Sequence, residues 1–301
     1  MAAVLRRRRS VQTPSIPTLW SPLSSCCHSI ALSIDSIPAM DPDTEVDFDL
    51  SLFLIRYKSG RVHRLMGTAR VEAGTDAVTG VTSKDVVIDA QSGLAARLYL
   101  PGEVPGLEKL PVIVCIHGGG FVVHSAFSRV HSRFLNTLVA AEGVVAVSVD
   151  YSLAPEHPLP TAYDDAWPAL GWTVASCSSS GQEPWLAEHG DTARLFVASD
   201  SAGANIAHNV TMRAGKDGLP GGGGARIDGM VLLHPFFRGG ELVPSERTDP
   251  AAGGEILGLH VRREVRDRPP VHQPAVHASG GVGGARLPAG TGHRGGARHD
   301  A

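Results

Sequence analysis

Short apolar runs that alternate with segments of helical length are the feature that most constrains the fold of this chain. Each run has few polar side chains, as expected of a strand covered on both faces of a sheet. Four runs occupy the middle of the chain: PVIVCI (111–116), VVAVSVD (144–150), RLFVAS (194–199) and IDGMVLLHP (227–235). Because strands that alternate with helices form parallel sheets, we predict an α/β fold: a mostly parallel sheet with helices on both faces.

Local signals place the other elements. KDVVIDA and GLAARLYL, separated around Gly93, predict a β-hairpin before the first apolar run. The segment 127–143 predicts a helix, because Val130, Phe134 and Leu138 follow helical spacing. Further helices are predicted over TAYDDAWPALGWTVAS (161–176) and AGANIAHNVTMRAG (202–215).

Composition excludes several classes of protein. The 301 residues are 43% hydrophobic and 19% charged, with a formal net charge of -3, which suits one buried core of ordinary size. The near-neutral charge and the 5% aromatic content argue against nucleic-acid binding. No apolar run reaches the roughly eighteen residues of a membrane span. The four cysteines lack metal-ligand spacing, so no metal site is predicted and a reducing compartment is expected.

Three segments differ in composition. Residues 1–39 contain the arginine run Arg6–Arg9, eight serines and one acidic residue. This leader resembles an organelle transit peptide, which would direct the protein to a plastid; alternatively, translation starts at Met40 and the protein is cytoplasmic. A basic nucleic-acid-binding arm is a weaker third interpretation. Residues 40–259 are predicted to form the α/β domain, and residues 260–301 a disordered tail.

The tail has an unusual composition. It contains seven Arg, five His, eight Gly and four Pro, but no Lys, no Ile, no aromatic residue and a single Leu. Read one base later with compatible codons, PVHQP (270–274) gives Phe-Ile-Asn-Pro and PAGTGHRGG (288–296) gives Gln-Val-Leu-Val-Thr-Val-Ala. Our hypothesis is a frame shift between Gly254 and His260. The sheet is then expected to end after about its sixth strand, with an open edge and an uncovered apolar face.

A candidate nucleophile, Ser201, lies in VASDSAGANIAHN, after an apolar run and before a helix. This is the layout of a nucleophile elbow, whose sharp turn needs small neighbours such as Ser199 and Gly203. The turn would aim the Ala202 N–H and the positive end of the helix at the reacting atoms, with Asp200 in a supporting role. Because Ser199 replaces the usual glycine, a simple helix cap is an equal alternative.

The motif HGGGF directly follows the first apolar run. Glycines let the backbone approach a ligand closely and present N–H groups to it. Such a loop completes the oxyanion hole of esterases, so Gly118, Gly119 and Ala202 are the predicted donors. His117 and Gly120 are predicted to support the loop. The alternative is a flexible glycine turn without a function.

HGGGF, DYSLAPEHPLPTAYDD and SDSAGAN, in this order, resemble the plant carboxylesterases of the hormone-sensitive-lipase branch of the α/β hydrolases. Gibberellin receptors and 2-hydroxyisoflavanone dehydratases belong to the same branch. The resemblance covers about residues 45–259 and implies that Ser201 is the nucleophile. Asp150, Glu156 and Asp164 match acids of the family's second motif, and we expect them to support the site through hydrogen bonds.

The partners of the serine are not assigned. A hydroxyl is a weak nucleophile until a base removes its proton. In this fold the acid and the histidine follow the serine, on loops after later strands. No strand is predicted before any histidine of the tail. Four earlier histidines are also not placed as a base: His117, His157, His208 and His234.

The resemblance therefore implies a carboxylic ester hydrolase that acts on small esters through Ser201, without a cofactor. This chain is predicted to be inactive, because the triad Asp and His are missing from the interpretable sequence. The alternatives are a non-catalytic small-molecule receptor of the gibberellin type, a dehydratase of the same fold, and a decayed product without a function.

Overall fold

The computed structural model describes residues 43–50, 52–104, 106, 108–221 and 225–237. The leader 1–39 and the tail 260–301 lie outside the described residues, and with them the predictions of a transit peptide, a frame shift and disorder.

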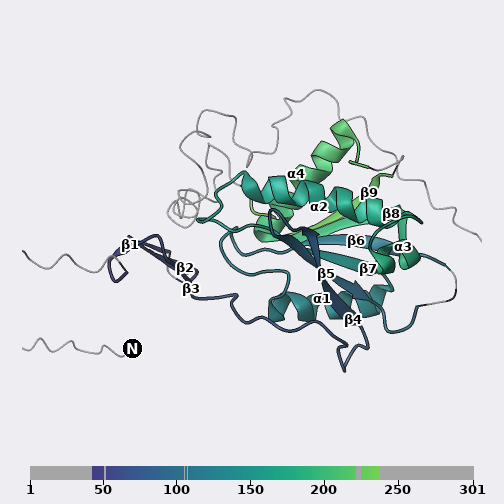
Figure 1. The fold of residues 1–301 in the computed structure, drawn as a ribbon, viewed down its shortest axis with the longest axis horizontal. Helices are drawn as coiled ribbons and strands as arrows, with labels where there is room; N and C mark the ends of the chain where they lie inside the picture. The colour runs from purple at the N-terminus through teal and green to yellow at the C-terminus, as the bar shows by residue number, and fades with distance from the viewer. Residues whose placement is uncertain (1–42, 51, 105, 107, 222–224, 238–301) are drawn as a thin grey trace, which may run out of the picture. The chain divides into compact units, whose positions relative to one another are not determined.

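A six-stranded sheet forms the centre of the fold (Figure 1). In spatial order, its strands are β4 (Thr82–Asp89), β5 (Leu94–Leu100), β7 (Val145–Asp150), β6 (Leu110–Ile116), β8 (Gly190–Asp200) and β9 (Ile227–Leu233). The four apolar runs of the sequence are β6, β7, β8 and β9, and these strands are parallel. β4 and β5 form the predicted antiparallel hairpin, which joins the sheet through β7. The prediction of a mostly parallel sheet is confirmed.

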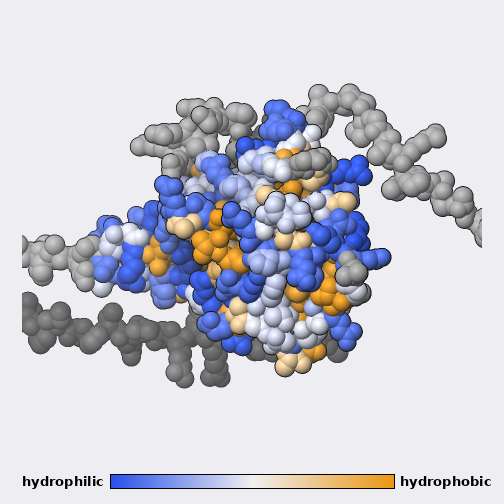
Figure 2. Space-filling model, turned by 45° about the vertical axis from the view of Figure 1, so that its right-hand side comes forward, coloured by the Kyte–Doolittle hydropathy of each residue, from blue (hydrophilic) through white to orange (hydrophobic). Residues whose placement is uncertain are grey.

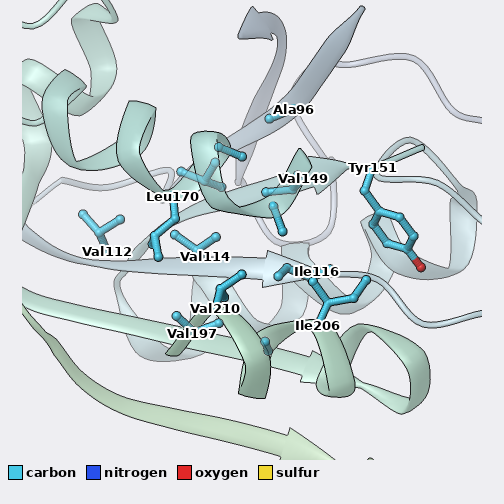
Figure 3. Packing of buried hydrophobic residues seen from close by; sticks show 14 of the residues in the cluster. Ala96, Val112, Val114, Ile116, Val149, Tyr151, Leu170, Val197, Ile206 and Val210 are labelled. Carbon is cyan, nitrogen blue, oxygen red and sulfur yellow. The ribbon is translucent and has the colours of Figure 1, made fainter. Parts of the chain in front are cut away.

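Helices cover both faces of this sheet, as predicted (Figure 1). One face carries α1 (Arg129–Glu142), and the other carries α2 (Thr161–Ser176) and α4 (Ser201–Asp217). Figure 3 shows Leu170 of α2 beside Val114 of β6, and Ile206 of α4 beside Ile116 of the same strand. Valines from neighbouring strands extend this cluster, so α4 is held by a continuous apolar core.

The apolar spacing of α1 does not mark its buried face. Val130 and Phe134 are 71% and 45% exposed. Ser132, on another face of the helix, is buried because its Oγ accepts hydrogen bonds from Tyr99 Oη (3.1 Å) and Arg97 Nη1 (3.4 Å). The spacing thus predicted the helix but not the side that packs on the sheet.

The structure adds elements that the sequence did not indicate. A separate three-stranded antiparallel sheet contains β1 (Val46–Leu50), β2 (Leu54–Tyr57) and β3 (Val62–Arg64). A short helix, α3 (Pro184–His189), precedes β8. α4 continues past its predicted end at Gly215 and stops at Asp217, before Gly218.

Hydrophobic surface gathers in patches between hydrophilic residues in the view of Figure 2. Among the large apolar side chains that stay exposed are Met230, Val231 and Leu233 on β9, which are 40%, 50% and 44% exposed. β9 is an edge strand of the described sheet; whether further strands follow lies outside the described residues. No helix in the described part of the chain is both long and apolar enough to cross a membrane.

Candidate active site

Ser201 occupies the turn between β8 and α4. Its φ is +49°, a strained value for a residue with a side chain, whereas Asp200 before it is extended (φ -122°, ψ 152°). A Cβ on Gly203 would lie 2.1 Å from the carbonyl oxygen of Ile116, so only glycine fits where α4 approaches β6. This sharp strand-to-helix turn has the form of a nucleophile elbow.

Ser199 stands where such elbows usually have glycine. Its hydroxyl donates to the carbonyl of Ala198 (2.5 Å) and accepts from the N–H of Ile116 (3.2 Å). The side chain is buried and its hydrogen-bonding groups are satisfied inside the strand pair β6–β8. The substitution is therefore compatible with the turn.

The glycine loop lies beside this elbow. The N–H of Gly118 donates to Asp200 Oδ1 (3.0 Å), and a Cβ on Gly118 would lie 2.3 Å from Asp200 Oδ2. Gly119 (φ +112°) and Gly120 (φ +60°) both adopt left-handed conformations. Among the described residues, the N–H groups of Gly119 and Gly120 donate to no protein acceptor. Gly118, a predicted oxyanion donor, is thus already engaged, whereas two neighbouring amides are available.

His117 holds the glycine loop through contacts with Gly118 and Tyr151. Its Nδ1 lies 2.8 Å from the carbonyl oxygen of Gly118, and its ring stacks on Tyr151 with centroids 4.3 Å apart. Tyr151 Oη in turn donates to the carbonyl of His117 (3.0 Å). Burial lowers the pKa of His117 to about 3, an effect that nearby His131 strengthens and the bond to Gly118 opposes. A neutral imidazole with these contacts suits a supporting role.

The predicted acids make different contacts. Asp150 ends β7 and accepts from the N–H of Ala126 (2.8 Å), in the segment that leads into α1; burial raises the pKa of Asp150. Glu156 accepts two hydrogen bonds from Arg64, each 2.7 Å long. Burial raises the pKa of Glu156, but these bonds and the charge of Arg64 outweigh it, so the net shift is downward. Asp164 is exposed on α2; partial loss of contact with water raises its pKa, and neighbouring Asp165 adds to this.

Arg64 is a contact residue that sequence reasoning missed. Besides Glu156, it donates to the carbonyl of Val122 (2.7 Å), next to the glycine loop, and to that of Ala154 (3.3 Å). It lies on β3, in the small sheet that no sequence pattern predicted. The signal available was indirect: Glu156 in the second motif needs a cationic partner.

A second missed network holds the segment after β9 against the elbow. Tyr163 Oη donates to Asn205 Oδ1 (2.8 Å), and Asn205 Nδ2 donates to the carbonyl of Phe236 (2.8 Å). The N–H of Phe236 donates to the carbonyl of Ser201 (3.0 Å). Tyr163 lies in the motif DYSLAPEHPLPTAYDD and Asn205 in SDSAGAN, so their places in these motifs could have indicated that they support the site.

The described residues bring no general base to the serine. No histidine in this part of the chain hydrogen-bonds to the Ser201 hydroxyl. His208 on α4 packs edge-on against Phe237 (centroids 5.1 Å apart), and His234 is exposed just after β9. No group of three or more metal-ligating side chains could hold a metal ion within the described residues.

A family model described as the alpha/beta hydrolase fold matches residues 113–264, about half of the chain. The chain belongs to the α/β-hydrolase fold family. The match begins in β6 and includes both the glycine loop and the elbow, so the fold predicted from the motifs is confirmed.

This α/β hydrolase is similar to curated proteins of plants. It is 47% identical to probable carboxylesterase 13 of Arabidopsis thaliana over 202 residues, which cover 65% of this chain and 61% of the relative. It is 44% identical to 2-hydroxyisoflavanone dehydratase of Glycyrrhiza echinata over 207 residues, 67% of this chain and 62% of the relative. The chain thus spans about three fifths of the length of these relatives.

A solved structure shows the same fold. It is a thermostable esterase from Pseudomonas putida, 24% identical, with a TM-score of 0.50. The similarity covers 64% of this chain and 57% of that one. At this identity the comparison supports the α/β-hydrolase fold alone.

Proposed function

We propose that this α/β hydrolase is a serine esterase, which transfers the acyl group of a small, uncharged ester to Ser201. The observation that carries the proposal is the bond between the Gly118 N–H and Asp200 Oδ1, which holds the glycine loop beside the residue before Ser201. Acyl transfer requires a nucleophile and backbone N–H donors that both reach the same ester carbonyl group: the nucleophile reaches its carbon, and the donors reach its oxygen.

The proposed oxyanion donors are the N–H groups of Gly119, Gly120 and Ala202. Ala202 lies in the first turn of α4, where an N–H has no acceptor within the helix. Gly118 is left out because its N–H is bonded to Asp200. Gly120, first expected only to support the loop, takes its place.

The reaction would begin with attack of Ser201 Oγ on the ester carbonyl carbon. The carbonyl oxygen becomes an oxyanion that the three amides stabilise. The carbon–oxygen bond to the alcohol then breaks, and water later releases the acid from Ser201. A base must take the serine proton, and the described residues bring none to it. We therefore propose that water takes the proton of Ser201 and returns a proton to the departing alcohol, so that Ser201 still attacks, but at a rate at least about a thousandfold below that of a complete triad.

The test uses the full 301-residue chain with 4-nitrophenyl acetate and butyrate, comparing wild type with Ser201→Ala. A matched control is Ser180→Ala, in an exposed loop. We expect slow hydrolysis that Ser201→Ala reduces to the buffer rate and Ser180→Ala leaves unchanged. Mass spectrometry after reaction with a fluorophosphonate should place the label on Ser201. Equal hydrolysis by wild type and Ser201→Ala would refute the proposal.

A second candidate function is binding of a small molecule without turnover. The absence of a histidine on the Ser201 hydroxyl, within the described residues, favours it. Stabilisation of wild type and Ser201→Ala by the same ester, with no product formed by either, would select this function over hydrolysis.

A further inference from the structure

The backbone of the glycine loop, and of the residues that follow it, is strained. Gly119 and Gly120 have φ values of +112° and +60°. Phe121 and His124, which carry side chains, have φ values of +64° and +71°. Residues with side chains adopt such left-handed conformations only where the surrounding structure enforces them. The contacts that enforce this conformation therefore also determine where the N–H groups of the loop point.

One carbonyl inside the loop receives two hydrogen bonds. The N–H groups of Val122 and Val123 both donate to the carbonyl oxygen of Gly119, at 3.0 Å each. The carbonyl of Gly119 and the N–H of Gly120 belong to one planar peptide unit, in which they point in opposite directions. Fixing the Gly119 carbonyl therefore fixes the direction of the Gly120 N–H, which is one of the proposed oxyanion donors.

Arg64 acts on the peptide unit that supplies the second of these bonds. Its Nε donates to the carbonyl of Val122 (2.7 Å), which shares a planar peptide unit with the N–H of Val123. Two rigid peptide units and two hydrogen bonds thus connect Arg64 to the Gly120 N–H. Because the guanidinium is cationic, its bond is stronger than one between neutral groups, and it polarises the peptide unit so that the Val123 N–H becomes a better donor.

The guanidinium group of Arg64 is itself held in place. Glu156 accepts two bonds from its Nη atoms, each 2.7 Å long, and the carbonyl of Ala154 accepts a third at 3.3 Å. The N–H of Ala154 also donates to the carbonyl of Phe121 (2.9 Å), so Arg64 and Ala154 hold the same end of the loop. The planar fork of arginine matches a carboxylate in this way and leaves Nε directed at a further acceptor.

Apolar packing brings Arg64 to the loop. Leu50 and Leu54 of the small sheet lie in one buried cluster with Val122 and Val123. In the antiparallel pair of β2 and β3, Leu54 is the register partner of Arg64. Burial of Leu54 against the segment after the glycines therefore places Arg64 next to the carbonyl that it holds.

We propose that Arg64 is a positioning residue for acyl transfer, which aims the Gly120 N–H at the oxyanion through the peptide units Val122–Val123 and Gly119–Gly120. This rests on the proposed esterase function, because the direction of that N–H matters only where an oxyanion develops. It gives the small sheet β1–β3 a part in the function, since β3 carries the residue that holds the glycine loop.

The experiment compares two substrates with the full chain: 4-nitrophenyl butyrate and its thionoester, in which sulfur replaces the carbonyl oxygen. Sulfur is a weak hydrogen-bond acceptor, so a misdirected N–H slows hydrolysis of the ester and affects the thionoester little. The rate of Ser201→Ala is subtracted from every rate. The ratio of the ester rate to the thionoester rate does not depend on how much of the protein is folded, so a purely structural defect leaves it unchanged.

Two variants of Arg64 and one control are compared with wild type. Arg64→Ala removes all of its bonds and should lower the ratio about tenfold or more, a part of the hundredfold effect of losing an oxyanion donor. Arg64→Lys keeps a charge beside Glu156 but lacks the planar fork, so the ratio should fall severalfold while the fold is retained. Arg56→Ala is the matched control and should keep the wild-type ratio, because Arg56 lies on β2 of the same sheet and pairs with Asp47 (2.8 Å).

The outcomes separate the two proposals. A wild-type ratio in Arg64→Lys, together with hydrolysis that depends on Ser201, would overturn the role of Arg64 and leave the esterase function intact. An equal fall in Arg56→Ala would overturn that role as well, because the effect would then belong to the sheet as a whole. Equal hydrolysis by wild type and Ser201→Ala would overturn the esterase function and the role of Arg64 with it.

Discussion

Replacing His131 with phenylalanine should make the protein less sensitive to acid. His131 lies on α1 with its Nε2 buried and unpartnered. Burial lowers its pKa to about 4; the charge of Asp200 opposes this shift and His124 adds to it. Because the folded pKa lies below the unfolded value of about 6.5, the stabilising contribution is fully present above pH 6.5 and is lost as the pH falls toward 4.

The size of the effect follows from proton linkage. Between pH 7 and pH 5 the unfolded chain gains nearly one proton at His131, and the folded chain almost none. At 1.36 kcal/mol per pH unit, this lowers the free energy of unfolding by about 2 kcal/mol. His117 responds with the same sign, since its folded pKa is also lowered, but it is present in both proteins and cancels in the comparison.

Urea unfolding followed by tryptophan fluorescence measures this difference, because Trp167, Trp172 and Trp185 pack against the core. Wild type should lose about 2 kcal/mol more than His131→Phe between pH 7 and pH 5. Between pH 8 and pH 7 the two should change in parallel, which serves as an internal control. Parallel curves over the whole range would refute the assignment of a buried neutral His131.

Two further predictions use matched pairs of substitutions. Gly203→Ala should lower the free energy of unfolding by about 2 kcal/mol or more, because its Cβ would lie 2.1 Å from the carbonyl of Ile116. Gly215→Ala, in the same helix with nothing within 4 Å, should raise it by about 0.5–1 kcal/mol; equal effects in urea unfolding would contradict the close approach of α4 to β6. Leu233→Lys should lower the sedimentation coefficient of any self-associated species in sedimentation velocity, because it places a charge on β9, an edge strand of the described sheet. Val87→Lys, on the opposite edge strand β4, should have no comparable effect on self-association. An equal reduction in both variants would show that β9 is not the strand through which the copies associate.

The sequence predicted where helices and strands lie better than it predicted which of their side chains are buried. Helix α1 was placed by the spacing of Val130 and Phe134, yet both are largely exposed and Ser132 is buried. Spacing reports that a helix has an apolar stripe, but it contains no information on which neighbour that stripe meets. Ser132 is buried because Arg97 and Tyr99, far away in the sequence, supply its hydrogen bonds.

The glycine loop 117–121 illustrates a similar limit. Three adjacent glycines are equivalent in the sequence, so nothing there shows which N–H groups are available. The structure separates them through one contact, the bond from Gly118 to Asp200. Arg64 was missed for the same reason: its partners, Glu156 and two backbone carbonyls, are brought to it by the fold rather than by a local pattern.

The position of the candidate site could be predicted from the sequence because its three motifs begin at the same edge of the sheet. In the parallel register, Ile116 of β6 pairs with Val149 of β7 on one side and with Ser199 of β8 on the other. The next residue of each strand, His117, Asp150 and Asp200, therefore lies at the same carboxyl edge. Each of the three motifs begins at or immediately beside that edge, so segments that are distant in the sequence must meet there. A chain that places a glycine loop and a serine turn after neighbouring parallel strands brings backbone donors and a hydroxyl together before any detail of the pocket is specified.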